Sequence, residues 1–299
     1  MKSIRGSPRV TERPPPERIR FKETHMTQRS IRFGLNHIIS PSLTHDELVD
    51  AAVKLGAVAI ELRNDVGDNS LKSVETARRV GARAADAGLE VKSINALYPF
   101  NVWNEVRARQ TETLASLAEA CGATGLVMCP LNEGRMLEDT PEKAASLRAA
   151  LSASRPILER HGLKGFVEPL GFPFSSMRLK RDALAAIDDI GGANVFSLVH
   201  DTFHHRGAGE EVLFATRTGL VHISGLEDPA ISFVDMLDGH RVLVSSKDRL
   251  DNVEQLRQLY ADGYDGVVSF EPFAKEVHGL PDPIAAVRDS MAYVRKALG

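Results

Sequence analysis

The chain has 299 residues, of which 43% are hydrophobic and 26% charged, a composition typical of a globular protein with enough apolar material for a large core. Its apolar runs are shorter than the roughly 20 residues that a membrane-spanning helix needs, so we expect no membrane partner. The net charge is −3; residues 1–25 hold seven Lys and Arg and three Glu, which gives +4 for this segment and leaves −7 for the rest of the chain. This negative charge argues against a nucleic-acid partner, because binding phosphates requires clustered Lys and Arg.

The N-terminal segment differs from the rest of the chain. It is basic, contains three consecutive prolines at 14–16, and lacks the apolar core of 7–15 residues that defines a secretory signal. We therefore predict a disordered extension over residues 1–28 and a single catalytic domain over residues 29–299. The two cysteines, Cys121 and Cys129, form no disulfide framework, which indicates reduced thiols and a cytoplasmic location.

From residue 31 onward, apolar strand-like runs alternate with helical patterns. Residues 31–36 precede a capping box formed by Thr44 and Glu47, and residues 57–62 precede a helical pattern over 73–88. Further strand candidates are residues 91–97, 124–130, 164–170, 194–201, 219–224 and 265–273, with helical patterns that include 111–122 and 141–162. Eight such units in about 270 residues predict an α/β fold, a (β/α)8 TIM barrel. An open doubly wound sheet is the alternative, but no Gly-x-Gly-x-x-Gly motif follows the first strand.

Polar residues stand at the carboxyl ends of the predicted strands, where the active sites of such barrels lie. In chain order these residues are Asn36, Glu61, Asn95, residues 129–132, Glu168, Asp201, His222 and Glu271. A single residue of this kind usually marks only the end of the core. Three carboxylates at one barrel mouth, however, would repel one another unless a cation lay between them. We predict one divalent metal ion (Mn²⁺, Mg²⁺, Co²⁺ or Zn²⁺) bound by Glu168, Asp201, His222 and Glu271.

These residues resemble the xylose-isomerase-like TIM barrel family of sugar isomerases and epimerases. In that family Glu, Asp, His and Glu at the ends of strands five to eight hold one divalent metal, and the sixth strand typically ends Asp-x-x-His. The matching pair here is Asp201 and His204. The resemblance implies that His204 contacts the oxygens of the substrate.

Four segments look most similar to inosose (2-keto-myo-inositol) isomerase. They are AIELRND (59–65), INALYPFN (94–101), FVEPLGFP (166–173) and DTFHH (201–205). Many relatives read His-x-Lys-Asp at strand seven, whereas this chain reads His-Ile-Ser-Gly over 222–225, and inosose isomerases also lack that Lys. A second departure is residues 242–252, which replace a Pro-Gly-x-Gly turn.

The resemblance implies a metal-dependent isomerase that moves the ketone of a polyol sugar or inosose to the neighbouring carbon through an enediolate. Glu168 and Glu271 would be the catalytic acid–base pair. Arg241 would bind a substrate hydroxyl or shield charge, with a surface salt bridge as the alternative role. The residues expected to line the sugar ring are Asn95, Trp103 and Phe172, although such aromatic residues also serve as core packing.

Several other functions are compatible with the same ligands. A dehydratase acting on inosose or 3-dehydroshikimate, a ketose 3-epimerase and a hydroxypyruvate isomerase would all use this barrel. An endonuclease IV-like DNA repair enzyme would need further His ligands and a basic face, and a non-catalytic binding module would not need an intact ligand set. The expected partner is a small-molecule polyol ketone or sugar, and the sequence is compatible with a homo-oligomer.

Overall fold

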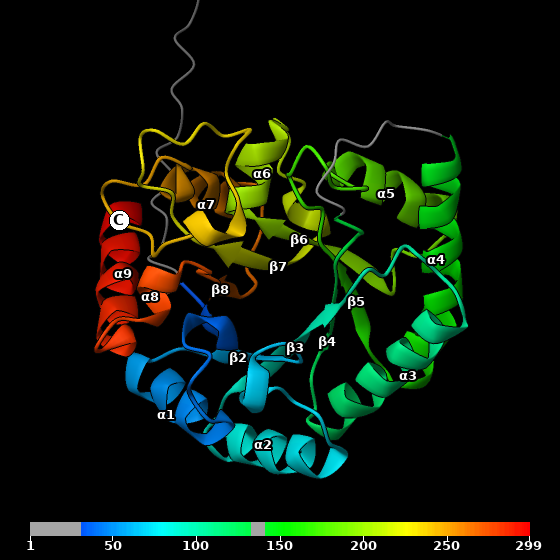
Figure 1. The fold of residues 1–299 in the computed structure, drawn as a ribbon, viewed down its shortest axis with the longest axis horizontal. Coiled ribbons are helices and arrows are strands. Elements are labelled where there is room, and N and C mark those ends of the chain that lie inside the picture. The colour runs from blue at the N-terminus through cyan, green and yellow to red at the C-terminus, as the bar shows by residue number, and fades with distance from the viewer. Residues whose placement is uncertain (1–30, 133–140) are drawn as a thin grey trace, which may run out of the picture. The chain divides into compact units, whose positions relative to one another are not determined.

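The computed structural model describes residues 31–132 and 141–299. The predicted disordered extension, residues 1–28, lies outside the described residues. Within them, eight parallel strands close into a barrel in the order β1 to β8, with β8 paired to β1 (Figure 1). The predicted (β/α)8 barrel is therefore confirmed, and the doubly wound alternative is wrong.

Strands and helices alternate along the chain, and Figure 1 shows the helices arranged around the barrel. The strands are β1 (Phe33–Asn36), β2 (Ala59–Arg63), β3 (Glu90–Leu97), β4 (Gly125–Met128), β5 (Lys164–Val167), β6 (Phe196–Asp201), β7 (Thr218–Ile223) and β8 (Val268–Phe270). The helices are α1 (His45–Leu55), α2 (Val74–Asp86), α3 (Glu105–Ala120), α4 (Pro141–Arg160), α5 (Lys180–Asp189), α6 (Thr202–Ala208), α7 (Asn252–Ala261), α8 (Lys275–His278) and α9 (Pro283–Leu298). None of the described helices combines the length and apolarity required to cross a membrane.

Local capping explains where two of the helices begin. The Thr44 hydroxyl accepts a hydrogen bond from the Glu47 amide, and the Glu47 carboxylate accepts one from the Thr44 amide at 2.8 Å, so the predicted capping box is confirmed. Helix α3 contains most of the predicted helical pattern over 111–122 and starts at Glu105, because the Asn104 side chain caps it.

A layer of apolar side chains fills the barrel below the carboxyl ends of the strands. Its members are Ala59, Val127, Phe166, Val199, Leu220 and Val267. Successive side chains of a strand point to opposite faces, so a residue two positions further on points inward again, one layer higher. That layer holds Glu61, Glu168, Asp201 and His222, and Glu271 follows Val267 by two such steps. The apolar layer is thus the floor on which the polar residues stand.

Candidate metal centre and active site

The four predicted metal ligands lie together at the carboxyl ends of β5 to β8. One ligand atom from each of Glu168, Asp201, His222 and Glu271 lies within 4.8 Å of the others. None of the four side chains belongs to a residue that is more than 3% exposed. Neighbouring strands fix part of this arrangement, because Asp201 is directly opposite His222 in the pairing of β6 with β7.

His222 lies at the centre of the group, between carboxylates on both sides of its ring. Nδ1 is 3.1 Å from Oε1 of Glu168 and 3.2 Å from Oε2 of Glu271. Nε2 is 3.1 Å from both oxygens of Glu61. Burial alone would lower the pKa of His222, but the surrounding carboxylates of Glu271, Glu61 and Glu168 raise it well above its usual value. The cluster therefore favours positive charge at its centre.

Two buried arginines hold Glu271 from either side. Nη1 of Arg63 donates to Oε1 of Glu271 at 2.9 Å, and Nη2 of Arg241 donates to Oε2 at 2.9 Å and also to Asp201. Both guanidinium groups lie over the ring of Phe273, at 5.2 Å for Arg63 and 4.8 Å for Arg241. Because Arg241 is only 1% exposed, the alternative of a surface salt bridge is wrong for this residue.

The charges of this cluster do not balance without a further cation. Its buried carboxylates are those of Glu61, Glu168, Asp201 and Glu271, and the arginines that pair with them are Arg63 and Arg241. With His222 neutral, as a metal-binding imidazole must be, two negative charges remain in a site that solvent barely reaches; with His222 protonated, one remains. Uncompensated buried charge is strongly destabilising, and a divalent ion supplies the missing charge. The donor set, carboxylate oxygens and one imidazole nitrogen, also suits such an ion.

His204 lies beside the cluster, on the first turn of α6. Its backbone amide donates to Asp201 at 2.9 Å, and its ring meets Phe172 edge-on at 4.9 Å between ring centres. Nδ1 of His204 is buried and has no hydrogen-bond partner in the described part of the chain. Phe172 is 3% exposed and stacks on Phe174, so it supports the His204 ring from the side.

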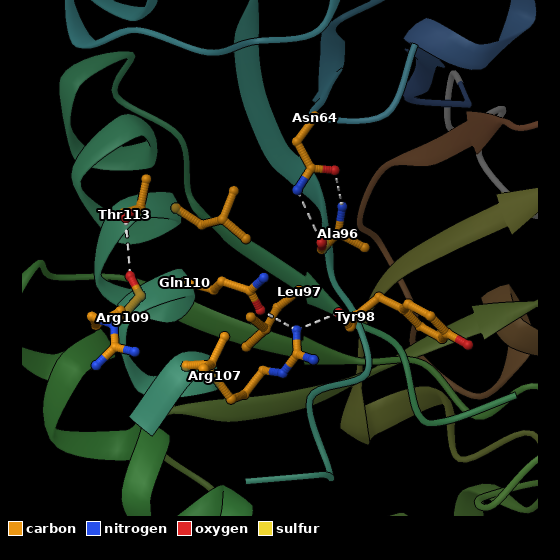
Figure 2. Close-up of a pocket in the computed structure, with 10 residues that line it drawn as sticks. Asn64, Ala96, Leu97, Tyr98, Arg107, Arg109, Gln110 and Thr113 are labelled. Atoms are coloured by element: carbon orange, nitrogen blue, oxygen red, sulfur yellow. Dashed lines mark hydrogen bonds between the residues drawn. The ribbon is translucent and has the colours of Figure 1, made fainter. Parts of the chain in front are cut away.

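Asn95 and Trp103 are placed differently from one another. Asn95 is buried and its side-chain amide donates to Oε2 of Glu61 at 2.9 Å, so it contacts the carboxylate that faces Nε2 of His222. Trp103 is partly buried and packs against the main hydrophobic core. Asn64 forms two hydrogen bonds with the backbone of Ala96, the residue after Asn95, and thereby holds the end of β3 (Figure 2).

Figure 2 also shows an open groove beyond the end of β3, against α3. Its volume is about 330 Å³, and its lining includes Tyr98, Arg107 and Gln110 but none of the four predicted ligands. Arg107 donates to the backbone carbonyl of Tyr98 and to the side-chain oxygen of Gln110. The residues that line the groove and the predicted metal ligands are therefore different sets.

Sequence reasoning missed the roles of three residues in the cluster. Glu61 was noted only as a strand end, and Arg63 was not singled out, although their spacing of two on β2 places both on the inner face. Cys129 follows β4, and its Sγ donates to Oε2 of Glu168 at 3.2 Å. Burial and the nearby Glu168 carboxylate raise the pKa of the Cys129 thiol well above its usual value, which keeps it protonated as a donor.

Comparison with known proteins gives a consistent result. Residues 49–297 match the model of the xylose isomerase-like TIM barrel family. Among solved structures, the chain is similar to a xylose isomerase domain-containing protein from Salmonella typhimurium LT2, with 31% identity, a TM-score of 0.79, and coverage of 89% of this chain and 97% of that one. A search of curated protein sequences finds no match.

Two more distant structures share the fold. One is the IolI protein with a bound zinc atom, at 20% identity and a TM-score of 0.74, covering 90% of this chain and 99% of that one. The other is D-psicose 3-epimerase with D-tagatose from Clostridium cellulolyticum H10, at 13% identity and a TM-score of 0.69, also covering 90% and 99%. Taken with the family match over residues 49–297, the barrel and its strand-end cluster show that this chain belongs to the xylose isomerase-like TIM barrel family.

Proposed function

We propose that this protein is a divalent-metal-dependent isomerase that moves the ketone of an inosose, or of a closely related polyol ketone, to the neighbouring carbon. The observation that carries the proposal is the buried group of Glu168, Asp201, His222 and Glu271. Counted with Glu61 and the paired arginines Arg63 and Arg241, this site keeps two negative charges when His222 is neutral, which match a divalent ion. The zinc atom in the IolI structure and the sugar epimerases among the structural neighbours support the same class of chemistry.

In this proposal the same four side chains hold the ion, and Mn²⁺, Mg²⁺, Co²⁺ and Zn²⁺ all suit their donor atoms. When bound, such an ion polarises a ketone and stabilises the negative charge that develops on its oxygen. Arg241, held between Asp201 and Glu271, adds a permanent positive charge beside the site. We assign to Arg241 the shielding of charge rather than a contact with a substrate hydroxyl.

Moving a ketone to the adjacent carbon requires a proton to be taken from one carbon and a proton to be given to its neighbour. Glu168 and Glu271 are the two candidates, and their contacts differ. The oxygens of Glu271 accept hydrogen bonds from Asn36, Arg63 and Arg241. Burial would raise the pKa of Glu271, but His222 and the two arginines lower it, which weakens Glu271 as a base.

Glu168 is the less restrained carboxylate of the pair. Its carboxylate lies within hydrogen-bonding distance of His222 and accepts a hydrogen bond from the Cys129 thiol, which is a weak and uncharged donor. We therefore assign proton abstraction to Glu168. The proton is then delivered to the former carbonyl carbon by Glu168 itself or through Glu271, and the hydroxyl proton passes to the oxygen of the former carbonyl, so the ketone moves without gain or loss of atoms. We assign a hydrogen bond to a substrate oxygen to Nδ1 of His204, which is buried and has no partner among the described residues.

Incubation with scyllo-inosose and Mn²⁺, followed by NMR, tests the proposal. A product whose ketone has moved to the adjacent carbon is the expected result. Loss of water would replace isomerase by dehydratase, and inversion of one carbon with the ketone in place would indicate an epimerase. Glu168→Gln serves as the inactive control. Glu90→Gln, the same change in the first residue of β3 and outside the cluster, should retain the activity of the unaltered protein.

A further inference from the structure

The two ring nitrogens of His222 face carboxylates with different surroundings. Nδ1 points to Glu168 and Glu271, which are both predicted metal ligands. Nε2 points away from them, to Glu61 on β2, with both carboxylate oxygens at 3.1 Å. Glu61 is fully buried and is not among the residues whose ligand atoms converge. One nitrogen therefore faces two of the four predicted ligands, and the other faces a carboxylate that is not one of them.

Glu61 is held in place by donors from two strands, β3 and β1. Its Oε2 accepts hydrogen bonds from the hydroxyl of Ser93 at 2.5 Å and from the amide of Asn95 at 2.9 Å. Its Oε1 lies 3.5 Å from the amide nitrogen of Asn36. An ionised carboxylate can only accept hydrogen bonds, so the group opposite Nε2 of His222 offers no proton of its own.

We infer that Glu61 is a positioning residue that fixes His222 in the tautomer protonated at Nε2, and so leaves the lone pair of Nδ1 free for the metal. The inference rests on the metal centre of the proposed function. A neutral imidazole carries one ring proton. If that proton were on Nδ1 it would point at Glu168 and Glu271, and His222 could not act as a ligand from that side.

The surroundings of Glu61 make Glu61→Gln an informative substitution. Asn36 uses its side-chain oxygen to accept from the Ile38 amide and from Arg63, so its NH2 group is the part that faces Glu61. The hydroxyl of Ser93 accepts from Asn95 and therefore donates toward Glu61.

Two donors consequently require an oxygen at the position of Oε2. The amide introduced by Glu61→Gln would place its oxygen there and its NH2 group at the position of Oε1, so Nε2 of His222 would face one acceptor and one donor in place of two acceptors. This removes the preference for the tautomer protonated at Nε2. Removal of outer partners of metal-binding histidines typically weakens metal affinity by about 10–100-fold.

Calorimetric titration with Zn²⁺ tests the inference on the full chain. Glu61→Gln should bind Zn²⁺ about 10–100-fold more weakly than the unaltered protein. Glu90→Gln is the matched control, because Glu90 carries the same side chain at the start of β3, where it bonds Thr124 and Lys92. Its affinity should be unchanged. Equal affinity in Glu61→Gln and the unaltered protein would overturn the role of Glu61 but leave the metal centre intact.

A second measurement does not depend on the stability of a variant. In ¹⁵N-histidine-labelled, Zn²⁺-loaded protein, the His222 signals, assigned with His222→Gln, should show a proton on Nε2 and coordination at Nδ1. Coordination through Nε2 would overturn the inference. Failure of the unaltered protein to bind any divalent ion would overturn the proposed metal centre, and this inference with it.

Discussion

Replacing Arg241 with Met should lower the melting temperature of the metal-free protein by roughly 6–20 °C. Arg241 is 1% exposed, and its Nη2 serves both Asp201 and Glu271. Breaking a buried ion pair by removing one partner costs about 3–5 kcal/mol, since the remaining charges stay buried without compensation. In domains of 150–250 residues, each kcal/mol corresponds to about 2–4 °C in melting temperature.

Methionine is the appropriate replacement because it separates charge from packing. The guanidinium group of Arg241 lies 5.2 Å from the ring centre of Phe203 and 4.8 Å from that of Phe273. A flexible apolar side chain can fill the space between these rings, so the loss should report mainly on charge. Thermal unfolding followed by circular dichroism, in EDTA at pH 7, gives the measurement.

Arg79→Met provides the matched control. Arg79 binds Asp46 at 2.7 Å, but the side chains are 54% and 46% exposed, and exposed pairs contribute at most about 1 kcal/mol. The control should therefore shift the melting temperature by no more than about 4 °C. If Arg241→Met and Arg79→Met produced similar shifts, the assignment of uncompensated charge to the buried cluster would be refuted.

Four further outcomes are expected. Glu168→Gln should lower turnover by about two to four orders of magnitude and stop exchange of the substrate α-proton with D₂O; a loss of exchange confined to Glu271→Gln would reverse the assignment of the base. EDTA should abolish turnover, and Mn²⁺ at 100 times its Kd should stabilise the fold by about 2.7 kcal/mol, so an unchanged melting temperature on adding metal would contradict the metal centre. Burial lowers the pKa of Lys180 from 10.5 to about 7, so between these pH values the unfolded chain binds more protons than the folded protein and the Lys180 contribution to stability rises with pH. The melting temperature should therefore rise more between pH 7 and pH 9 in the unaltered protein than in Lys180→Met. Equal rises would contradict the lowered pKa of Lys180. Deletion of residues 1–28 should change neither melting temperature nor turnover, and a large loss in either would show that this segment contributes to the barrel.

The parts of the molecule that depend on repeating patterns could be predicted from the sequence. Alternation of apolar runs with helical spacing predicts the barrel. Because parallel strands expose their carboxyl ends at one edge, the same pattern predicts that Glu168, Asp201, His222 and Glu271 lie together. Both predictions rest on periodicity and topology, which a single sequence records.

Contacts between strands that are far apart in the chain could not be predicted in this way. Arg63 reaches Glu271 across 208 positions, and although its spacing from Glu61 places it on the inner face of β2, nothing near it in the sequence identifies Glu271 as its partner. The burial of Arg241 likewise depends on Phe203 and Phe273, which lie on either side of it in space. The start of α3 could not be predicted for a different reason, because the cap at Asn104 precedes the apolar pattern.

The two halves of the barrel contribute different parts of the centre, and this affects how the protein folds. All four predicted ligands come from the second half, whereas Glu61 and Arg63 come from β2 in the first. They meet because β1 pairs with β8, a contact between segments more than 230 residues apart, which chain entropy makes slow to form. A fragment ending before β8 lacks Glu271, and a fragment starting after β2 lacks the supports of Glu271 and His222. High-affinity metal binding should therefore be acquired at a late step, when the ring of strands closes, and bound metal can serve as a probe of that closure during refolding.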